Sequence, residues 1–486
     1  MKALNSLKSQ SCRMLAFGAV ALSLGAASGH AQSKAVTTPT EETSESALSE
    51  WWNGKYLTGN WFGVRDTLAD RGLTFRGKYE GIFFGVVDSQ KGQRGFYDQE
   101  LAFDGALDFA KFTGWEGLDG LSAFGGVRWR DSRANSNPNS FVQANSLFQP
   151  SNNQSGTQWR LTTFGLAYTT PELFGIEDFL TLRGGWLQPQ KEFIDQPLSK
   201  MFINNAIESA KGVGGNIPFS SSFSTWGGTL QIKPTKWAYA KGGLFMAYPS
   251  ATSSSNHGLA FEGFAPDTSL NGLMAMTEFG VTPKIGASEL PGKYAIGGYY
   301  WGNQKDSFNG TSNYGQYGMY FQADQMLFRE PSAPVEEPAP MGKDGKSMAS
   351  SSGKSFKEPV PAVKPKLSKQ GLSTFNLVSL APKYNNLFPF YFQTGLVYQG
   401  LIPTRDEDMT MFALGYGSYS LYNIENLQNN GNVNQPNYTM VLEWDYRIQI
   451  NKWAYFQPFA QYIIKPNGTG AVQNATILGF AYALSF

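Results

Sequence analysis

Cysteine and histidine are almost absent from this 486-residue chain, which contains one Cys and two His residues. The single cysteine, Cys12, precedes the apolar stretch 14–27, and small residues around Ala31 follow that stretch. This order is typical of a secretory signal over residues 1–31, with the cysteine on the wrong side of the apolar stretch for a lipoprotein. We therefore expect a mature chain without thiol, disulfide or lipid anchor. With no metal-ligand cluster and no phosphate-binding motif in the sequence, we expect no metal and no cofactor.

Long hydrophobic runs are also missing. No segment beyond the signal approaches the ~20 apolar residues that a membrane-spanning helix needs. An excess of one charge is missing too, because removing the three basic residues of the signal leaves 36 Lys and Arg (39 minus 3) against 38 Asp and Glu. Such a balance gives no reason to expect a nucleic-acid partner or an acidic one.

Glycine and aromatic residues, by contrast, are plentiful, with 54 Gly and 15% Phe, Trp and Tyr. In the segment 475–486, the large apolar residues Phe480, Tyr482, Leu484 and Phe486 alternate with small ones. A strand with no polar residue on its large face is typical of a wall that touches lipid, and such barrels enrich aromatic residues at both membrane interfaces. The sequence therefore predicts an all-β outer-membrane barrel. A soluble all-β protein is the weaker alternative, because its strands would be shorter.

Alternating segments continue from residue 73 onward, separated by connections that are alternately short and long, as expected for periplasmic turns and extracellular loops. There are sixteen such segments, and an even number returns the last strand to the periplasmic side. The predicted fold is a 16-stranded antiparallel transmembrane β-barrel over 73–486. Its strands are 73–87, 96–111, 121–131, 157–169, 178–187, 221–233, 236–248, 271–284, 292–303, 315–328, 372–381, 388–401, 409–420, 437–450, 452–465 and 475–486.

Two segments before the barrel have their own character. Residues 32–56 are rich in Ser, Thr and Glu over most of their length, which predicts a flexible leader. Residues 57–72 predict a short periplasmic helix that Asn60 caps and Gly72 ends.

Two connections within the barrel are unusually long. The third outer loop, 188–220, contains an expected amphipathic helix at 198–211. We expect this loop to fold inward and narrow the pore, since a barrel of this width otherwise leaves an open channel. The connection 330–370, rich in Pro, Ser and Lys, predicts a disordered periplasmic insertion.

Side-chain parity separates the lumen from the lipid in each predicted strand. Large apolar residues mark the outer face, and the charged residues between them are assigned to the lumen. The candidate pore-lining and substrate-binding residues are Arg128, Arg130, Glu100, Asp104, Lys241, Glu443, Asp445 and Arg447. Lys241 lies near aromatic residues that would suit a sugar ring, although its strand has large residues on both faces. For every one of these residues a purely structural role in a polar barrel wall is the alternative.

Several segments resemble the OprB-type carbohydrate-selective porin family. The opening segment resembles the family's N-terminal helix and first strand, with Asn60 where an Asp is usual and Phe62 where a Gly is usual. The similar segments are 57–75, 323–330, 395–401, 446–450, 457–458, 461–464 and 475–486. The resemblance implies a sixteen-stranded porin that admits sugars. The insertion at 331–370 departs from the family's shorter turn.

Three functions follow from these observations. The resemblance favours an outer-membrane porin for passive diffusion of small carbohydrates. A general or anion-selective porin is the alternative, and it would be favoured if Arg and Lys outnumbered the acids at the narrowest point. A structural anchor or adhesin would need a function in 331–370 or the outer loops. We expect no enzyme, because His257 in a Ser-rich loop is better explained as a surface residue than as a catalytic base.

The predicted partners follow from the predicted location in the outer membrane of a Gram-negative cell. They are small sugars, the surrounding lipid, and the barrel-assembly machinery, because the pattern ending on Phe486 resembles the signal that this machinery reads. The fold class also allows a homo-oligomer.

Overall fold

The computed structural model describes residues 48–132, 138–151, 153, 158–209, 211–217, 223–247, 257, 272–331 and 367–486. The chain divides into two units, 1–50 and 51–486, and the second contains all the strands. The predicted signal 1–31, the leader up to residue 47 and residues 332–366 of the predicted insertion lie outside the described residues.

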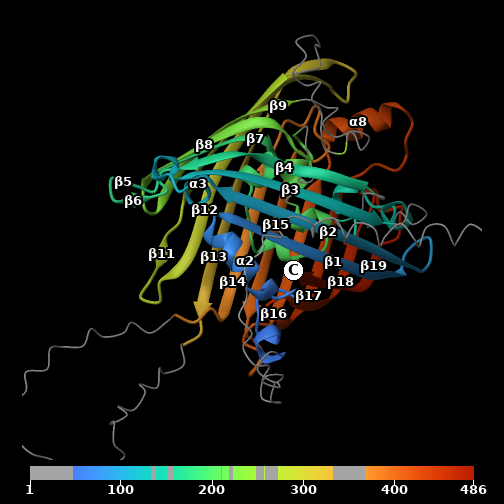
Figure 1. Ribbon diagram of the computed structural model, residues 1–486. Coiled ribbons are helices and arrows are strands. Elements are labelled where there is room, and N and C mark those ends of the chain that lie inside the picture. Colours follow the sequence, from blue (N-terminus) through green and yellow to red (C-terminus); the bar gives the residue numbers. More distant parts are fainter. Residues whose placement is uncertain are drawn as a thin grey trace, which may run out of the picture. The chain divides into compact units, whose positions relative to one another are not determined.

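The second unit is a closed antiparallel barrel of sixteen strands (Figure 1). Each strand pairs with the next along the chain, and β19 pairs with β1 to close the sheet. The predicted ranges agree with these strands to within four residues at each end. The barrel strands are β1 (Leu73–Asp88), β2 (Arg94–Asp108), β3 (Leu121–Ser132), β4 (Gln158–Thr169), β7 (Leu180–Leu187), β8 (Thr225–Thr235), β9 (Ala238–Ala247), β10 (Gly272–Val281), β12 (Leu290–Asp306), β13 (Ser312–Arg329), β14 (Gly371–Leu380), β15 (Phe390–Gln399), β16 (Met409–Ser418), β17 (Tyr438–Asn451), β18 (Ala454–Ile464) and β19 (Ala475–Ser485).

The remaining described elements are short and lie in the connections. The hairpin β5 (Glu172–Leu173) and β6 (Ile176–Glu177) and the strand β11 (Lys284–Ile285) occupy turns. The helices are η1 (Trp61–Gly63), α2 (Val64–Asp70), α3 (Phe109–Thr113), η2 (Glu116–Leu118), α4 (Pro138–Val142), η3 (Ser146–Phe148), α5 (Pro189–Phe193), η4 (Ser199–Met201), α6 (Asn205–Glu208), α7 (Lys211–Gly214) and α8 (Leu421–Asn429). Among the residues described, no helix has the length and apolar character needed to cross a bilayer.

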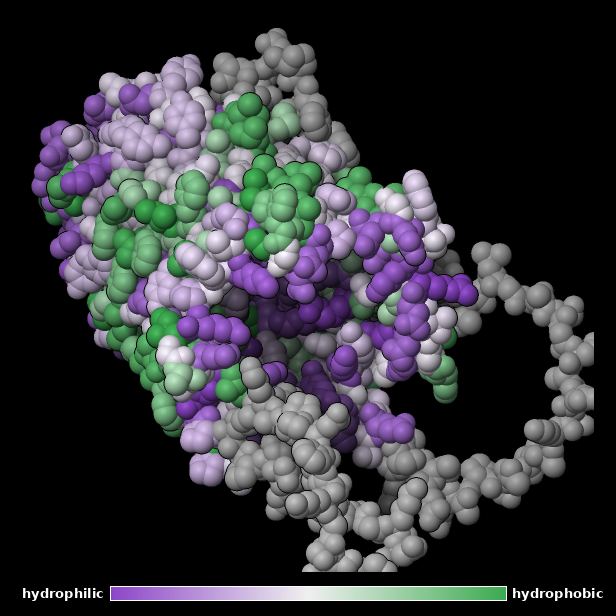
Figure 2. Space-filling view, turned by 90° about the vertical axis from the view of Figure 1, so that its left-hand side faces the viewer, coloured by the Kyte–Doolittle hydropathy of each residue, from purple (hydrophilic) through white to green (hydrophobic). Residues whose placement is uncertain are grey.

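Alternation of exposure along each strand follows the predicted parity. On β17, the Trp444 side chain is 47% exposed whereas Glu443 beside it is 1% exposed. Hydrophobic residues accordingly spread over the outer wall in Figure 2, which also shows a hollow lined by hydrophilic residues. A wall that is apolar outside and polar around its hollow is the arrangement that a barrel in a bilayer requires.

The predicted periplasmic helix is present as η1 followed by α2. Asn60 precedes η1 without a side-chain capping bond, and the N-cap residue of α2 is Gly63. The Asn60 side chain instead accepts the N–H of Asp66, in the first turn of α2, at 3.3 Å. Gly72, with φ of +85°, follows the helix in the left-handed region that favours glycine. The Trp61 ring stacks on Phe75 of β1 with centroids 5.1 Å apart, which fixes the helix against the barrel.

The last part of the predicted leader is packed against the barrel, which corrects the expectation of a flexible segment reaching residue 56. The Trp51 ring lies 5.1 Å from the ring of Trp453 in the turn between β17 and β18. Trp52 contacts the same residue at 6.0 Å, and Leu57 donates its N–H to Ser485 O at 2.8 Å. Contacts among these three indole rings and the Leu57 hydrogen bond hold residues 51–57 at the end of the barrel where β1 begins and β19 ends.

The described parts of the connection between β7 and β8, residues 188–209, 211–217 and 223–224, fold into the lumen as predicted, and we call them the inward loop. The prediction of a single helix over 198–211 is wrong. The loop contains the separate short helices η4, α6 and α7 instead, because backbone N–H and C=O groups between them bond to the barrel wall rather than to one another. In Figure 1 these green helices lie inside the ring of strands.

Apolar residues of the inward loop form a core with the inner face of the barrel, mainly along β9 to β18 and also along parts of β1, β2, β7 and β19. Phe193, Phe202 and Ile207 are no more than 2% exposed. They belong to one buried cluster with inward-facing residues of the wall, which include Phe245, Met276, Phe375, Tyr391, Met411 and Val441. This half of the lumen is therefore filled, and the large residues on both faces of strands such as β9 are explained by the two apolar surfaces they meet.

Candidate functional site

A cavity of about 430 Å³ remains between the inward loop and the other half of the barrel wall. Its walls come from β1 to β4, from one residue each of β17 and β18, and from the face of the loop that turns away from the apolar core. The charged residues that line it are Arg76, Lys78, Glu80, Glu100, Asp104, Arg128, Arg130, Arg160, Lys191, Lys200, Glu208 and Arg447. This volume is in the range of about 300–1,000 Å³ that is common for small-molecule sites.

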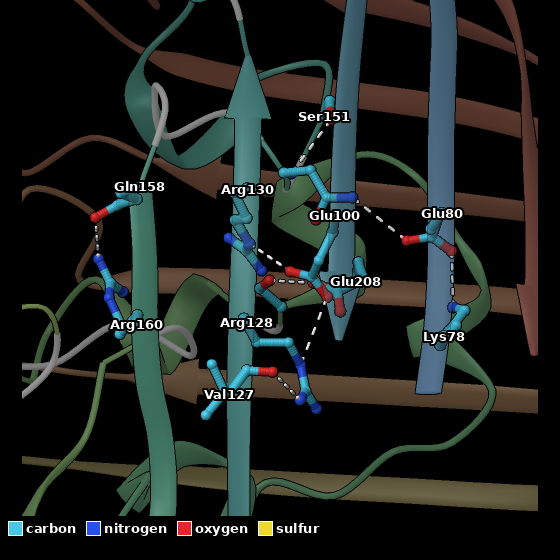
Figure 3. Close-up of polar contacts among 12 residues, drawn as sticks. Lys78, Glu80, Glu100, Val127, Arg128, Arg130, Ser151, Gln158, Arg160 and Glu208 are labelled. Atoms are coloured by element: carbon cyan, nitrogen blue, oxygen red, sulfur yellow. Dashed lines mark hydrogen bonds and ion pairs between the residues drawn. The ribbon is translucent and has the colours of Figure 1, made fainter. Parts of the chain in front are cut away.

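Paired charges cross this wall from strand to strand (Figure 3). Arg128 on β3 bonds Asp104 on β2 through two parallel hydrogen bonds of 2.9 Å each, NH1 to Oδ1 and NH2 to Oδ2. Arg130 forms an ion pair with Glu100, its direct partner in the register of β2 and β3. Lys78 and Glu80 on β1 pair at 2.8 Å. Each pair keeps planar donors and acceptors in fixed positions at the edge of the cavity.

Five of the eight predicted site residues line this cavity, namely Arg128, Arg130, Glu100, Asp104 and Arg447. Arg447 donates to Gln457 Oε1 at 2.7 Å and to Met201 O of the inward loop at 3.0 Å. The parity of the strands therefore identified five of the twelve charged residues that line the cavity.

The other three predicted residues, Lys241, Glu443 and Asp445, face inward but lie behind the inward loop. Glu443 accepts the backbone N–H groups of Ile203 at 2.6 Å and Asn204 at 2.9 Å. Asp445 is fully buried and accepts Gln457 Nε2 at 2.7 Å. Because the loop covers them, these residues are outside the cavity, which corrects their assignment as pore-lining.

Lys241 on β9 is covered in the same way. Its ammonium bonds the backbone carbonyl of Glu192 and lies 3.6 Å from the Glu192 carboxylate, both in α5. The aromatic residue that it contacts is Phe193, 5.1 Å from the ring centre. The lysine fastens the start of the inward loop to the wall.

Several cavity residues were missing from the predicted set. Arg160 on β4 lies on the inner face of a predicted strand, so parity alone could have found it. Lys191 and Glu208 come from the inward loop, where the sequence has no period that assigns a face. Tyr455 on β18 donates to Glu80 at 2.6 Å, and the Arg447 guanidinium lies over its ring at 4.4 Å.

His257 has none of the geometry of a catalytic base in the contacts described for it. Its ring stacks on Trp159 at 4.4 Å with an angle of 5° between the planes. Trp159 is 48% exposed, so the pair lies on the outer surface of the barrel. In the described part of the chain, no group of three or more His, Cys, Asp or Glu is arranged to hold a metal ion.

The closed barrel with an inward loop and a polar cavity defines the class of the protein as a porin. Comparison with known proteins gives the family: the profile described as "Carbohydrate-selective porin, OprB family" matches residues 93–486. The chain belongs to the OprB family of carbohydrate-selective porins. It is an outer-membrane sugar porin, located in the outer membrane of a Gram-negative cell.

Two relatives agree with this assignment over most of their length. The chain is 24% identical to Porin B of Pseudomonas aeruginosa over 454 residues, which cover 88% of this chain and 90% of that protein. The structure is similar to the high-pH structure of Pseudomonas putida OprB, with a TM-score of 0.73 and 22% identity. That match covers 89% of this chain and 99% of the other, and it shows the shared fold.

Proposed function

We propose that small sugars cross the outer membrane through the cavity beside the inward loop, in contact with Arg128, Arg130, Glu100, Asp104 and Arg447. The observation that carries this proposal is the division of the lumen: one half is filled by the loop and its apolar core, and the other keeps a cavity of about 430 Å³ lined by charged side chains. A solute that passes the barrel at this level meets these side chains.

The chemistry of the wall suits hydroxyl groups. A sugar entering the cavity exchanges bonds to water for bonds to guanidinium donors and carboxylate acceptors, which are held in planar arrays by their own pairing. The Tyr455 ring lies under the Arg447 guanidinium and so helps to fix this donor at the wall of the cavity. Binding stays weak because transport requires fast exit, so we expect millimolar dissociation constants, about 4 kcal/mol of binding free energy.

The proposed function is a channel without catalysis. The charged residues at the cavity are arginines, lysines and carboxylates, several of them in ion pairs, and the His257 imidazole stacks on the outer surface. Two further partners belong to the same proposal: lipid around the apolar outer wall, and the barrel-assembly machinery, which we expect to recognise the last strand with Phe486.

The test is the conductance of the purified protein in planar bilayers, with and without added glucose. We expect glucose at millimolar concentration to reduce the ion current, and glucose to enter liposomes faster than through a porin of equal conductance without sugar preference. If glucose and short oligosaccharides leave the current unchanged and enter no faster, the sugar-contact proposal for these residues fails.

An anion preference is a second candidate function that one observation favours. Eight basic residues line the cavity against four acidic ones. This excess of positive charge would favour the entry of anions over cations.

A further inference from the structure

We infer that the cavity favours sugars that carry a carboxylate, such as a uronic acid, over neutral sugars of the same size. This inference rests on the proposed function, because it names a subclass of the sugars that cross the same cavity. It follows from how the charges of the wall are paired.

The carboxylates of the wall are already shared among several arginines. Glu100 pairs with Arg130 and lies 3.7 Å from Arg128, and Asp104 is held by two hydrogen bonds from Arg128. Arg76 on β1 is the register partner of Asp104 but lies beyond ion-pair distance of it. Two acids therefore serve two arginines and leave a third beside them without an ion pair.

Lys78 and Lys200 pair with the carboxylates of Glu80 and Asp195, but three further cations of the cavity have no such partner. Arg447 bonds the oxygen atoms of Gln457 and Met201. Over the residues that the structure describes, no carboxylate lies within ion-pair distance of Arg76, Lys191 or Arg447. These three cations come from β1, from the inward loop and from β17, so they surround the passage rather than lie on one side.

The acids behind the loop do not cancel this excess. Asp195, which pairs with the cavity residue Lys200, belongs to the same count. With Asp195, Glu443 and Asp445 added to the four acids of the cavity, there are eight basic residues against seven acidic ones. Both hidden carboxylates are also turned toward loop and wall partners, Glu443 toward backbone N–H groups and Asp445 toward Gln457. The side chains that line the cavity therefore keep an excess of positive charge.

A sugar carboxylate matches both features of the site. Its anionic group can pair with a guanidinium that lacks a carboxylate partner, and its hydroxyls can use the neutral polar side chains nearby, among them Gln158, Gln188 and Gln190. A neutral sugar has only the second set of contacts. A cavity of one charge sign also concentrates solutes of the opposite sign, and salt weakens this effect.

The experiment compares entry of glucuronate, glucose and lactate into liposomes that contain the full-length protein. At about 0.02 M salt we expect glucuronate to enter at least about threefold faster than glucose, and the ratio to approach one at about 0.5 M salt. Lactate has a carboxylate but lacks the hydroxyls of a sugar. We expect its rate of entry, relative to that of an uncharged solute of its own size, to be raised less than the rate of glucuronate entry is raised relative to glucose.

The variant R76Q/K191Q tests the origin of the preference by halving the charge excess of the cavity from four to two. We expect the ratio of glucuronate entry to glucose entry to fall in this variant. Lys284, which pairs with Glu289 in the turn after β10, provides the matched control K284Q, which should keep the ratio of the unchanged protein.

The outcomes separate the inference from the proposed function. If glucose enters and reduces the ion current but glucuronate enters no faster at low salt, the inference is overturned and the sugar channel stands. If the rate of lactate entry is raised as much as the rate of glucuronate entry, the cavity selects anions in general and the assignment to sugar acids is wrong. If neither sugar enters, the proposed function itself fails. If R76Q/K191Q does not fold, the salt dependence of the unchanged protein still decides the question.

Discussion

The carboxylate of Glu443 on β17 accepts the backbone N–H of Asn204 in the inward loop at 2.9 Å, across 239 residues of sequence. A second bond, from the N–H of Ile203 at 2.6 Å, holds the same point. One buried side chain thus fastens the segment that decides which half of the lumen is open.

Replacing Glu443 with Ala should loosen the inward loop. Two buried N–H groups would lose their acceptor, at a cost of about 1–3 kcal/mol for each. We expect a larger and noisier single-channel conductance and weaker block by glucose, with a smaller change for E443Q, which keeps one acceptor. Glu425 on α8, outside the lumen, provides the control E425Q. An unchanged conductance in E443A would show that the apolar core alone holds the loop.

Replacing Arg128 and Arg130 together with Ala should raise ion conductance and reduce sugar block. The change removes two guanidinium groups and leaves Glu100 and Asp104 without their partners, so the wall loses its ordered donors and becomes more acidic. We expect the reversal potential in a salt gradient to shift toward cation preference. Arg71, at the end of α2 and outside the cavity, offers R71A as a control. Sugar block that persists in the double variant would remove both arginines from the sugar site.

Asp408, in the turn between β15 and β16, should contribute stability that depends on pH. Burial alone would raise its pKa, but hydrogen bonds from Arg405, the Tyr446 hydroxyl and the Gln449 N–H lower the pKa below its ordinary value of 3.8. A depressed pKa stabilises the folded state above the unfolded pKa, and this contribution disappears as the pH falls through the folded value. We expect D408N to lower the free energy of unfolding by about 1–3 kcal/mol at neutral pH.

The measurement for Asp408 is urea unfolding of the reconstituted barrel at a series of pH values. The difference between the unchanged protein and D408N should be constant at neutral pH and shrink only below about pH 4. A difference that is the same at pH 7 and pH 3 would mean that the ionised carboxylate does not stabilise this turn.

Phe486 should matter for assembly of the barrel through its contacts with β1 and β2. It exchanges two backbone hydrogen bonds with Gly77, at 2.6 and 2.9 Å, and its ring lies 5.6 Å from that of Phe103. We expect deletion of Phe486 to lower the yield of folded barrel and to destabilise it by about 1–3 kcal/mol, while the pore that does form is unchanged. The readout is the fraction of protein that migrates as the folded, heat-modifiable form.

Gly77 provides a matched pair of substitutions for the same contact. A Cβ atom at Gly77 would lie 2.3 Å from the Phe486 ring, whereas one at Gly85 on the same strand would meet only a carbonyl oxygen at 3.9 Å. G77A should therefore resemble the deletion of Phe486, and G85A should fold normally. Equal yields of G77A and G85A would contradict the role given to the Phe486 ring.

The strand count predicts the side of the membrane for each loop. α8 and the connection between β13 and β14 lie at opposite ends of the barrel, because an odd number of strands separates them. A protease-cleavable tag in 421–436 should be cut on intact cells, and one in 331–370 should be protected. Cleavage of the second tag would reverse the assigned orientation.

The sequence by itself determined the barrel, because the relevant signal is local. The alternation of Trp444 with its neighbours Glu443 and Asp445 indicates which face of the strand contacts lipid, and this indication does not depend on the rest of the chain. The same parity assigned Arg128, Arg130, Glu100 and Asp104 to one side of adjacent strands. Their pairing then follows from the register of β2 and β3, which the connection 109–120 joins.

Only the tertiary structure decided which inward residues the pore exposes. Glu443 and Arg447 lie on the same face of the same strand, yet the inward loop covers the first and leaves the second in the cavity. The path of the loop depends on contacts such as that of Glu443 with Asn204, between residues far apart in the sequence. The sequence of the loop has no periodic pattern that predicts these contacts, because the loop backbone bonds mainly to the barrel wall. The strands therefore supply most of the charges of the pore, whereas the fold of the inward loop decides which of them stay exposed and adds Lys191, Lys200 and Glu208.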